Sequence, residues 1–286
     1  MIAALEILRP RQWAKNAFVF APYVFALRFN DPATLRNAAI ATLCFIAVSG
    51  AVYIFNDFMD LATDQLHPMK KFRPLAAGKI SGKRAGALMV ALLLAGYFLV
   101  SFLPKSCFVI ILIYLVFNIA YSKGLKNYAI IDVLIIAMGF VFRVLMGGYA
   151  IGAEVSAWII LATLLLALFL AFGKRYAEIN GEGASSESAR RSFNSYNKEL
   201  LGKLITVSCA AALICYGIYA ADAAARTGRQ EFVYTTIFVV FGLFRYMQII
   251  FVNGSGEEPE KILFRDRPLA INLVLWLIFS VFILIY

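Results

Sequence analysis

Apolar and polar positions alternate along the chain in blocks whose length matches a lipid bilayer. Runs of mostly apolar residues, each near the ~17–25 residues that a membrane-crossing helix needs, are separated by polar loops. The runs lie at residues 14–29, 37–56, 85–104, 106–121, 128–150, 156–173, 203–221, 232–252 and 268–286. The pattern predicts an all-α integral membrane protein with about nine transmembrane helices.

Composition agrees with this pattern. Of the 286 residues, 62% are hydrophobic and only 15% are charged, which excludes an ordinary soluble globular domain. The first apolar run has no small-residue cleavage site and leads directly into further runs, so we expect it to remain in the protein. No soluble domain interrupts the runs, and residues 1–286 are predicted to form a single polytopic membrane domain.

Positive charge is distributed unequally between the two sets of alternating loops. Twenty of the 27 Lys and Arg residues fall on one side, five fall on the other, and two lie within apolar runs. The positive-inside rule places the N-terminus and the loops near 57–84, 122–127, 174–203 and 253–267 in the cytoplasm, and the C-terminus outside. We expect a protein of the cell (inner or plasma) membrane, with the lipid bilayer as a partner and no nucleic acid. A homo-oligomer is compatible with the sequence.

An acidic segment follows the second apolar run, on the same side as the basic loops. Asp57, Asp60 and Asp64 are spaced i, i+3 and i+7, which would place them on one stripe of a continued helix, with Asn56 beside it. The stripe would be about 10–12 Å long. Carboxylates at a helix C-terminus are disfavoured by the helix dipole, and a bound cation would remove that conflict. The spacing suits one or two Mg²⁺ ions with a diphosphate between them.

Basic residues follow the acidic segment immediately. His67 and Pro68 are expected to end the helix, and Lys70, Lys71 and Arg73 come next. Acids that hold a metal beside bases that hold phosphate indicate a site for a Mg²⁺-diphosphate substrate. We interpret the single histidine as a turn residue in preference to a metal ligand, because no other histidine could share a ligand set with it.

The segments NDFMDLATD and HPMKKFRPLAAGKIS, residues 56–64 and 67–81, resemble the first aspartate-rich motif of the UbiA superfamily of intramembrane prenyltransferases. The resemblance implies a UbiA-type helical bundle with a cytoplasm-facing site. It also implies that the acidic segment binds Mg²⁺ and diphosphate, with Lys70 and Arg73 nearby. The metal ligands implied are Asn56, Asp57, Asp60 and Asp64.

The second motif departs from the ordinary pattern of that superfamily, which has carboxylates at this position. The chain has GKRYAEIN at 173–180, where Lys174 and Arg175 replace acids and Glu178 is the only carboxylate. This segment resembles the phosphoribosyltransferase branch of the superfamily, whose acceptor is decaprenyl phosphate. So do LRPRQWAKN at 8–16, YSKGLK at 121–126, GFVFRVLMGGYAIG at 139–152 and DRPL at 266–269.

The resemblance implies a Mg²⁺-dependent transfer of the 5-phosphoribosyl group from 5-phosphoribosyl 1-diphosphate (PRPP) to a polyprenyl phosphate, giving a precursor for cell-wall arabinan-type glycans. Arg9, Arg11 and Lys15 precede the first span, where a lipid headgroup would lie. The catalytic candidates are Asp57, Asp60, Asp64 and Lys126. The substrate-binding candidates are Lys15, Asn56, Lys70, Lys71, Arg73, Tyr121, Arg143, Lys174, Arg175 and Glu178.

Two arginines, Arg143 and Arg245, fall inside expected spans. A charge at the centre of a membrane helix costs about 2.5–3.5 kcal/mol on insertion scales, so we expect Arg143 to face an internal cavity. Asp132 lies eleven residues earlier on the same helix face, but at ~16 Å it is too far away to pair with Arg143. For Arg245, a structural contact between helices is an equally good interpretation.

Two other functions remain open at this point. One is a prenyltransferase that moves an isoprenoid from its diphosphate to an aromatic or other acceptor, and GKRYAE argues against it. The other is a lipid transporter or flippase, because charged residues inside spans also mark transport paths. The chain shows no inverted repeat, which argues against transport.

Overall fold

The computed structural model describes residues 2–25, 31–180, 195–253, 262 and 265–285, and every regular element in these ranges is helical. The α-helices are α1 (Ile2–Ile7), α2 (Ala17–Phe25), α3 (Pro32–Met59), α4 (Leu61–Leu66), α5 (Gly82–Val100), α6 (Lys105–Lys123), α7 (Ile131–Ala150), α8 (Ala157–Asn180), α9 (Lys198–Thr227), α10 (Thr236–Asn253) and α12 (Arg267–Ile285). The 3₁₀ helices are η1 (Pro10–Asn16), η2 (Lys70–Phe72), η3 (Leu125–Asn127) and η6 (Gln230–Thr235). The predicted all-α class is confirmed.

Among the described residues, eight helical segments are long and apolar enough to cross a membrane. The first expected span, at 14–29, differs from the others. There η1 ends at Asn16, and α2 continues for nine residues with Pro22 inside it. Residues 26–30 lie outside the described ranges. The eight long segments and the shorter α2 correspond to the nine apolar blocks of the sequence.

Polar residues at the helix ends set where several of these helices begin and stop. The Asp31 carboxylate accepts a backbone N–H from the first turn of α3 at 2.9 Å. The side chains of Ser81 and Asn197 accept in the same way at the starts of α5 and α9. Gly228, with φ of 72°, ends α9 in the left-handed conformation that glycine adopts without strain.

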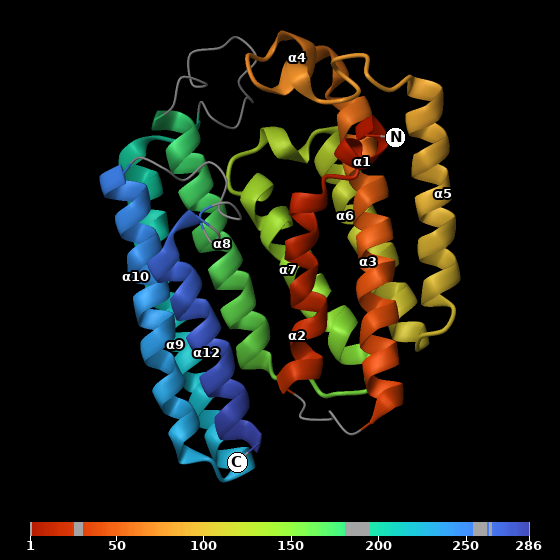
Figure 1. The fold of residues 1–286 in the computed structure, drawn as a ribbon. Coiled ribbons are helices and arrows are strands. Elements are labelled where there is room, and N and C mark those ends of the chain that lie inside the picture. The colour runs from red at the N-terminus through yellow and green to blue at the C-terminus, as the bar shows by residue number, and fades with distance from the viewer. Residues whose placement is uncertain (1, 26–30, 181–194, 254–261, 263–264, 286) are drawn as a thin grey trace.

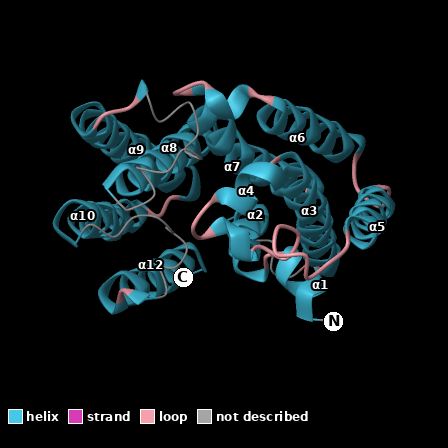
Figure 2. Cartoon of the chain, turned by 90° about the horizontal axis from the view of Figure 1, so that it is seen from above, coloured by secondary structure: helices cyan, strands magenta, loops and turns pink. Residues whose placement is uncertain are grey.

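Helix α7 is the central element of the bundle, and it packs against α2, α3, α6 and α8. One apolar cluster joins α2, α3, α6 and α7 and includes Phe45 and Met146. A second cluster joins α7, α8, α9 and α10 and includes Phe169 and Leu201. Both views place α5 and α10 on opposite flanks (Figures 1 and 2). The bundle therefore has two halves that share α7.

Large apolar side chains remain exposed on the outward faces of the helices. Leu94, Val116, Ile214, Ile237 and Ile278 are each at least 60% exposed. An apolar surface of this extent is unfavourable in water, whereas lipid covers it without cost. The protein is a multi-pass membrane protein.

Helices α1 and α4 lie at one end of the bundle, and α12 ends at the other (Figure 1). Viewed from the α4 end, α4 lies over the middle of the bundle (Figure 2). The α6–α7 connection and the C-terminal part of α8 are found at this same end (Figure 1). The fold therefore gathers at one end the loops in which the sequence carries its acidic and basic motifs.

Gly147 allows α2 and α7 to approach closely. A Cβ atom added at this position would lie 2.0 Å from the carbonyl oxygen of Val19, which is a backbone atom and cannot rotate away. Small residues permit such close approaches between membrane helices. The position of α2 within the bundle therefore depends on the absence of a side chain here.

We expect Gly147→Ala to lower the free energy of unfolding by about 1–3 kcal/mol, because the two backbones must separate. The control is Gly217→Ala in α9, where an added Cβ meets nothing within 4 Å, so its stability should stay equal or rise slightly. Thermal unfolding of both variants in one detergent measures the difference. Equal midpoints for both variants would contradict the close approach.

Candidate active site

The acidic segment spans the point where α3 ends and α4 begins. Helix α3 ends at Met59, and Asp60, with φ −98° and ψ 2°, separates it from α4. The prediction of one unbroken helix through Asp64 is therefore wrong. Backbone N–H groups of Asp60 and Asp64 still donate to the carbonyl oxygens four residues earlier, at 3.0 and 2.8 Å. The chain keeps coiling through the break at Asp60, and Asp57 and Asp64 share Arg73 while Asp60 pairs with Lys126.

Arg73 connects the two most buried carboxylates. Asp57 is 2% exposed and Asp64 is 4% exposed. Arg73 Nη1 lies 3.3 Å from Asp57 Oδ1 and 2.5 Å from Asp64 Oδ2. Buried carboxylates need such partners, because an unpaired charge in this environment is very costly. The expectation that Arg73 lies close to the acidic segment agrees with this geometry.

Arg9 is a residue that the sequence did not assign to the acidic segment. Its guanidinium pairs with Asp57 Oδ1 and lies over the ring of Tyr53, 5.3 Å from the ring centroid. Its backbone has φ 50° and ψ 63°, a left-handed conformation that is uncommon outside glycine. Arg9 and Asp57 are 48 positions apart, so no local pattern could have indicated the pair. The N-terminal segment therefore belongs to the site.

Lys126 brings the α6–α7 connection to the third carboxylate. This lysine lies in η3, is 8% exposed and pairs with Asp60 Oδ1. The other oxygen of Asp60 accepts a hydrogen bond from Asn56 Nδ2 at 3.1 Å. Asn56 Oδ1 in turn accepts from the Ser122 hydroxyl at 3.2 Å. Lys126 and Asn56, both predicted site residues, thus lie together at Asp60.

The other basic residues predicted for the acidic side of the site are more exposed to solvent than Lys126. Lys71 is exposed, and its ammonium lies 5.3 Å from the centroid of the Phe72 ring. Lys70 and Lys15 are half-buried. His67 Nδ1 accepts the backbone N–H groups of the second and third residues after it, at 3.2 and 3.3 Å. The histidine is therefore a turn residue, as the sequence predicted.

A second charged cluster surrounds the end of α8. Arg175, 4% exposed, places its Nε atom 3.0 Å from Asp132 Oδ2 and its Nη1 atom 2.5 Å from Glu178 Oε2. Lys174 Nζ lies 4.0 Å from the other oxygen of Glu178. The Tyr196 hydroxyl donates to Asp132 Oδ1 at 2.9 Å. Asp132 and Tyr196 were not predicted as site residues, and the structure joins both to the GKRYAE motif.

Both clusters lie at the α4 end of the bundle, where the C-terminal part of α8 is also found (Figure 1). Glu178, in α8, is one of the charges that act on the imidazole of His67, which follows α4. Tyr121, at the end of α6, is one of the groups that act on Arg175. The three acids with their cations and the GKRYAE cluster therefore form two sides of one polar region above an apolar bundle.

The predicted site residue Arg143 lies among different partners. It is 4% exposed, and its Nε atom donates to Asn16 Oδ1 at 2.9 Å while Nη1 donates to the Gly139 carbonyl at 2.8 Å. Its guanidinium also lies 4.8 Å from the centroid of the Phe45 ring. The structure does not bring Arg143 together with the carboxylates. It connects α7 to the start of α2 and to α3.

Arg245 makes a contact between helices. Its Nη2 atom lies 2.7 Å from Asp266 Oδ2, and Asp266 Oδ1 accepts the Leu269 N–H at 2.9 Å. The hydrogen bond from Arg245 holds the pKa of the Asp266 carboxyl below its usual value. The DRPL motif therefore caps α12 and fastens it to α10.

The acidic segment contains oxygen atoms of the kind that bind Mg²⁺. In the described ranges, no three acidic, histidine or cysteine side chains converge closely enough to hold a metal ion. Asp57 Oδ2, however, is buried and has no hydrogen-bond partner among the described residues. An unpartnered buried carboxylate oxygen is costly, and coordination to a cation would remove that cost. Carboxylate and amide oxygens are the ligands that Mg²⁺ prefers, so the donor chemistry of the segment suits the ion, while its carboxylates are paired with Arg9, Arg73 and Lys126.

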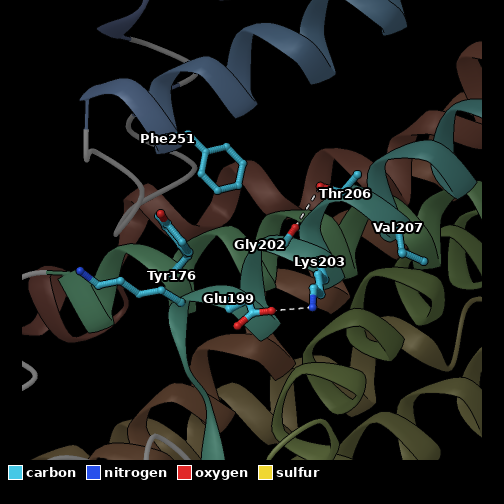
Figure 3. Close-up of a pocket in the computed structure, with 8 residues that line it drawn as sticks. Tyr176, Glu199, Gly202, Lys203, Thr206, Val207 and Phe251 are labelled. Carbon is cyan, nitrogen blue, oxygen red and sulfur yellow. Dashed lines mark hydrogen bonds and ion pairs between the residues drawn. The ribbon is translucent and has the colours of Figure 1, made fainter.

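A groove of about 420 Å³ opens elsewhere, between α8, α9 and α10 (Figure 3). Tyr176 and Phe251 lie on one side of it, and the Glu199–Lys203 pair of α9 lies on the other (Figure 3). None of its lining residues comes from α3 or α4. The groove is therefore separate from the acidic segment. The candidate site is defined by the charged side chains of the acidic segment and of the GKRYAE motif.

Comparison with known proteins identifies the fold and the family. Residues 17–266 match the UbiA prenyltransferase family. The chain belongs to this family. The resemblance first indicated by the aspartate motif is thereby confirmed, and the protein is a transferase.

Three relatives illustrate the similarity. Decaprenyl-phosphate phosphoribosyltransferase of Mycolicibacterium smegmatis is 30% identical, over 96% of this chain and 89% of the relative. The enzyme of the same name from Mycobacterium tuberculosis is 31% identical, over 96% and 91%. A UbiA homolog from Archaeoglobus fulgidus, solved with GPP and Mg²⁺, superposes with a TM-score of 0.76 at 21% identity, over 99% of this chain and 100% of that one. The last likeness concerns the fold alone.

His67 should make stability depend on pH in a defined direction. Burial, followed by the nearby charge of Lys70, lowers the pKa of its imidazole below the ordinary value of 6.5. The neutral ring is therefore favoured in the folded state, and the stability it contributes is present above pH 6.5 and lost as the pH falls through the lowered pKa. His67→Asn supplies an acceptor that does not titrate.

We expect wild type to lose stability relative to His67→Asn as the pH falls below 6.5. Unfolding midpoints of both proteins, measured across this range in one detergent, check the expectation. All other titrating groups are common to the two proteins and cancel in the comparison. A constant difference at every pH would show that the imidazole does not titrate in the folded protein as described.

Proposed function

We propose that the protein transfers the 5-phosphoribosyl group of PRPP to a polyprenyl phosphate and releases diphosphate. The observation that carries this proposal is the near full-length similarity to two decaprenyl-phosphate phosphoribosyltransferases. The product, a polyprenylphosphoryl-5-phosphoribose, would serve the synthesis of cell-wall or arabinan-type glycans. Polyprenyl phosphate would reach the site from the bilayer, and PRPP from the aqueous side.

The diphosphate of PRPP would bind at the acidic segment together with Mg²⁺. The ion's ligands would come from Asn56, Asp57, Asp60 and Asp64, and the unpartnered oxygen of Asp57 supports this assignment. The A. fulgidus homolog solved with GPP and Mg²⁺ also supports it. When bound, Mg²⁺ would neutralise charge on the departing diphosphate. Lys126, Arg9 and Arg73 would then have diphosphate oxygens as alternative partners.

The GKRYAE cluster would bind the other end of the donor. Lys174 keeps 43% of its side chain exposed, and Lys70, Lys71 and Lys174 are candidates for the 5-phosphate. Glu178 is a hydrogen-bond acceptor that suits ribose hydroxyl groups. Arg175 already binds two carboxylates, so we assign it the orientation of Glu178. The acidic segment would thus bind the diphosphate of PRPP and the GKRYAE cluster its ribose and 5-phosphate, which fixes the orientation of the donor.

The reaction needs no general base from the protein. A phosphate oxygen of the lipid, already anionic, would attack C1 of the ribose while the bond from C1 to the diphosphate oxygen breaks. We expect inversion at C1. The side chains of this chain would hold two anions in reach of one another, with Lys15, Tyr121 and the cations at the acidic segment screening their repulsion. The positive-inside asymmetry supports a cytoplasmic position for this region.

One alternative has an observation in its favour. The A. fulgidus homolog is bound to GPP, a prenyl diphosphate, so this chain could use a prenyl diphosphate as donor. Against it stand Lys174 and Arg175, which occupy positions where a second Mg²⁺-binding motif would need carboxylates. The identity of the donor separates the two functions.

We expect membranes that contain the protein to convert ribose-labelled PRPP and polyprenyl phosphate into a lipid-extractable labelled product, in the presence of Mg²⁺. Chelation of Mg²⁺ should stop the conversion. A parallel reaction with labelled prenyl diphosphate and an aromatic acceptor is the control for the alternative. Consumption of prenyl diphosphate with no labelled ribose in the lipid would refute the proposed function.

Asp60→Asn should reduce turnover by about 100-fold or more, because it removes a charge from the proposed metal and diphosphate site. The matched control is Asp222→Asn, which removes an acid that pairs with Arg226 one turn away in α9, outside the candidate site. Initial rates of lipid labelling at saturating substrates measure both. Wild-type rates in Asp60→Asn would remove the metal role from this carboxylate.

A further inference from the structure

Asp132 is the centre of a buried polar network that no step of the proposed reaction uses directly. It is 0% exposed, and each of its oxygens has a partner: Tyr196 at 2.9 Å and Arg175 at 3.0 Å. These residues come from the start of α7, the end of α8 and the segment before α9. Apolar side chains would join three helices at less desolvation cost, so a charged network here calls for a function.

Ile130, two residues before Asp132, has a backbone conformation that its own side chain disfavours. Its φ is 70° and its ψ is −47°, and a β-branched residue is strained at positive φ. Its N–H donates to the Tyr196 hydroxyl at 2.6 Å. The same hydroxyl therefore holds both the strained residue and Asp132. Strain of this kind persists only where surrounding contacts maintain it.

The strained residue follows Lys126 by four positions. Backbone hydrogen bonds flank this short connection: the N–H groups of Asn127 and Tyr128 donate to Gly124 and Leu125 at 2.9 and 3.2 Å, and the Asp132 N–H donates to Tyr128 at 3.1 Å. Between these bonds the Ile130 N–H is held by the Tyr196 hydroxyl, so the conformation at Ile130 sets how η3 joins α7. This connection brings Lys126 to Asp60.

The same network also reaches the opposite side of the site. Arg175, fixed by Asp132, places Nη1 2.5 Å from Glu178. Glu178 is the residue of α8 whose charge interacts with His67 across the polar region. Asp132 is thus linked through Tyr196 to the connection that carries Lys126, and through Arg175 to Glu178.

We propose that Tyr196 and Asp132 are positioning residues that hold Lys126 and Glu178 at a fixed separation on the two sides of the donor site. The inference rests on the proposed function for its substrate, PRPP. Neither residue touches the substrate, and each acts through a side chain that does. Loosening the network would weaken the simultaneous binding of the diphosphate and of the other end of PRPP, while the lipid acceptor would bind as before.

Tyr196→Phe tests this with the loss of a single oxygen atom, and Asp132→Asn is a second variant that keeps the side-chain shape. The matched control is Tyr216→Phe. Tyr216 is also buried, and its hydroxyl bonds to Thr235 and Trp276, each at 2.8 Å, in a cluster formed by other helices. The two Tyr→Phe variants each lose one buried hydroxyl with two hydrogen-bond partners, so a general effect of lower stability would be common to them. Asp132→Asn also removes the buried charge that pairs with Arg175.

We expect KM for PRPP to rise about five- to tenfold in Tyr196→Phe and Asp132→Asn, with KM for the lipid unchanged, and no such rise in Tyr216→Phe. Hydrogen exchange of peptides covering 123–133 should accelerate by about the same factor in the first two variants only. Tyr196→Phe removes only one hydroxyl group, so we expect this variant to fold. If Asp132→Asn does not fold, the result for Tyr196→Phe alone tests the proposal.

Unchanged PRPP KM in Tyr196→Phe would overturn the proposal, even if exchange accelerated. An equal rise of the KM for PRPP in Tyr216→Phe would also overturn it. If wild type does not use PRPP at all, the proposed function fails, and exchange at 123–133 then decides whether Tyr196 fixes the position of Lys126.

Discussion

Three carboxylates at the end of an apolar bundle must be neutralised, and the arrangement of the site follows from how the fold achieves this. Asp57 and Asp64 are almost fully buried, and Asp60 is only partly exposed. Their cations come from three separate places: Arg9 before α2, Arg73 after α4 and Lys126 between α6 and α7. Charge neutralisation therefore connects distant segments at one point, where Asp57 Oδ2 has no hydrogen-bond partner among the described residues.

The second side of the site differs from the first in which of its groups are exposed. At the end of α8, Arg175 is buried between Asp132 and Glu178, whereas Lys174 keeps 43% of its side chain exposed. Under the proposed function, this exposed lysine would meet the phosphate end of the donor while the diphosphate binds at the acidic segment. Helix α7 belongs to both apolar clusters, and the connection before it carries Lys126 to one side while Asp132 fixes the other. The position of α7 therefore determines the separation of the two sides of the site.

Much of this could be predicted from sequence, and the successes share a physical cause. Apolar blocks predicted the helices because membrane insertion depends on local composition, and the spacing of the aspartates with Arg73 is also local. The break at Asp60 was not predicted, because no Gly or Pro in residues 56–64 marks a helix end there. Arg9 and Tyr196 were missed because their partners are 48 and 64 positions away. Arg143 shows the reverse case: a buried charge suggested a substrate, whereas Asn16 and aromatic rings satisfy it.

The proposed function depends on binding of the PRPP diphosphate to the acidic segment through a divalent ion. Calorimetric titration of the purified, lipid-supplied protein with PRPP, at increasing Mg²⁺ and without the lipid acceptor, tests it most directly. The account predicts binding that strengthens with Mg²⁺ in wild type and loses this dependence in Asp57→Asn. Binding of PRPP that is equally strong in the presence of a chelator, or no binding at any Mg²⁺ concentration, would contradict it.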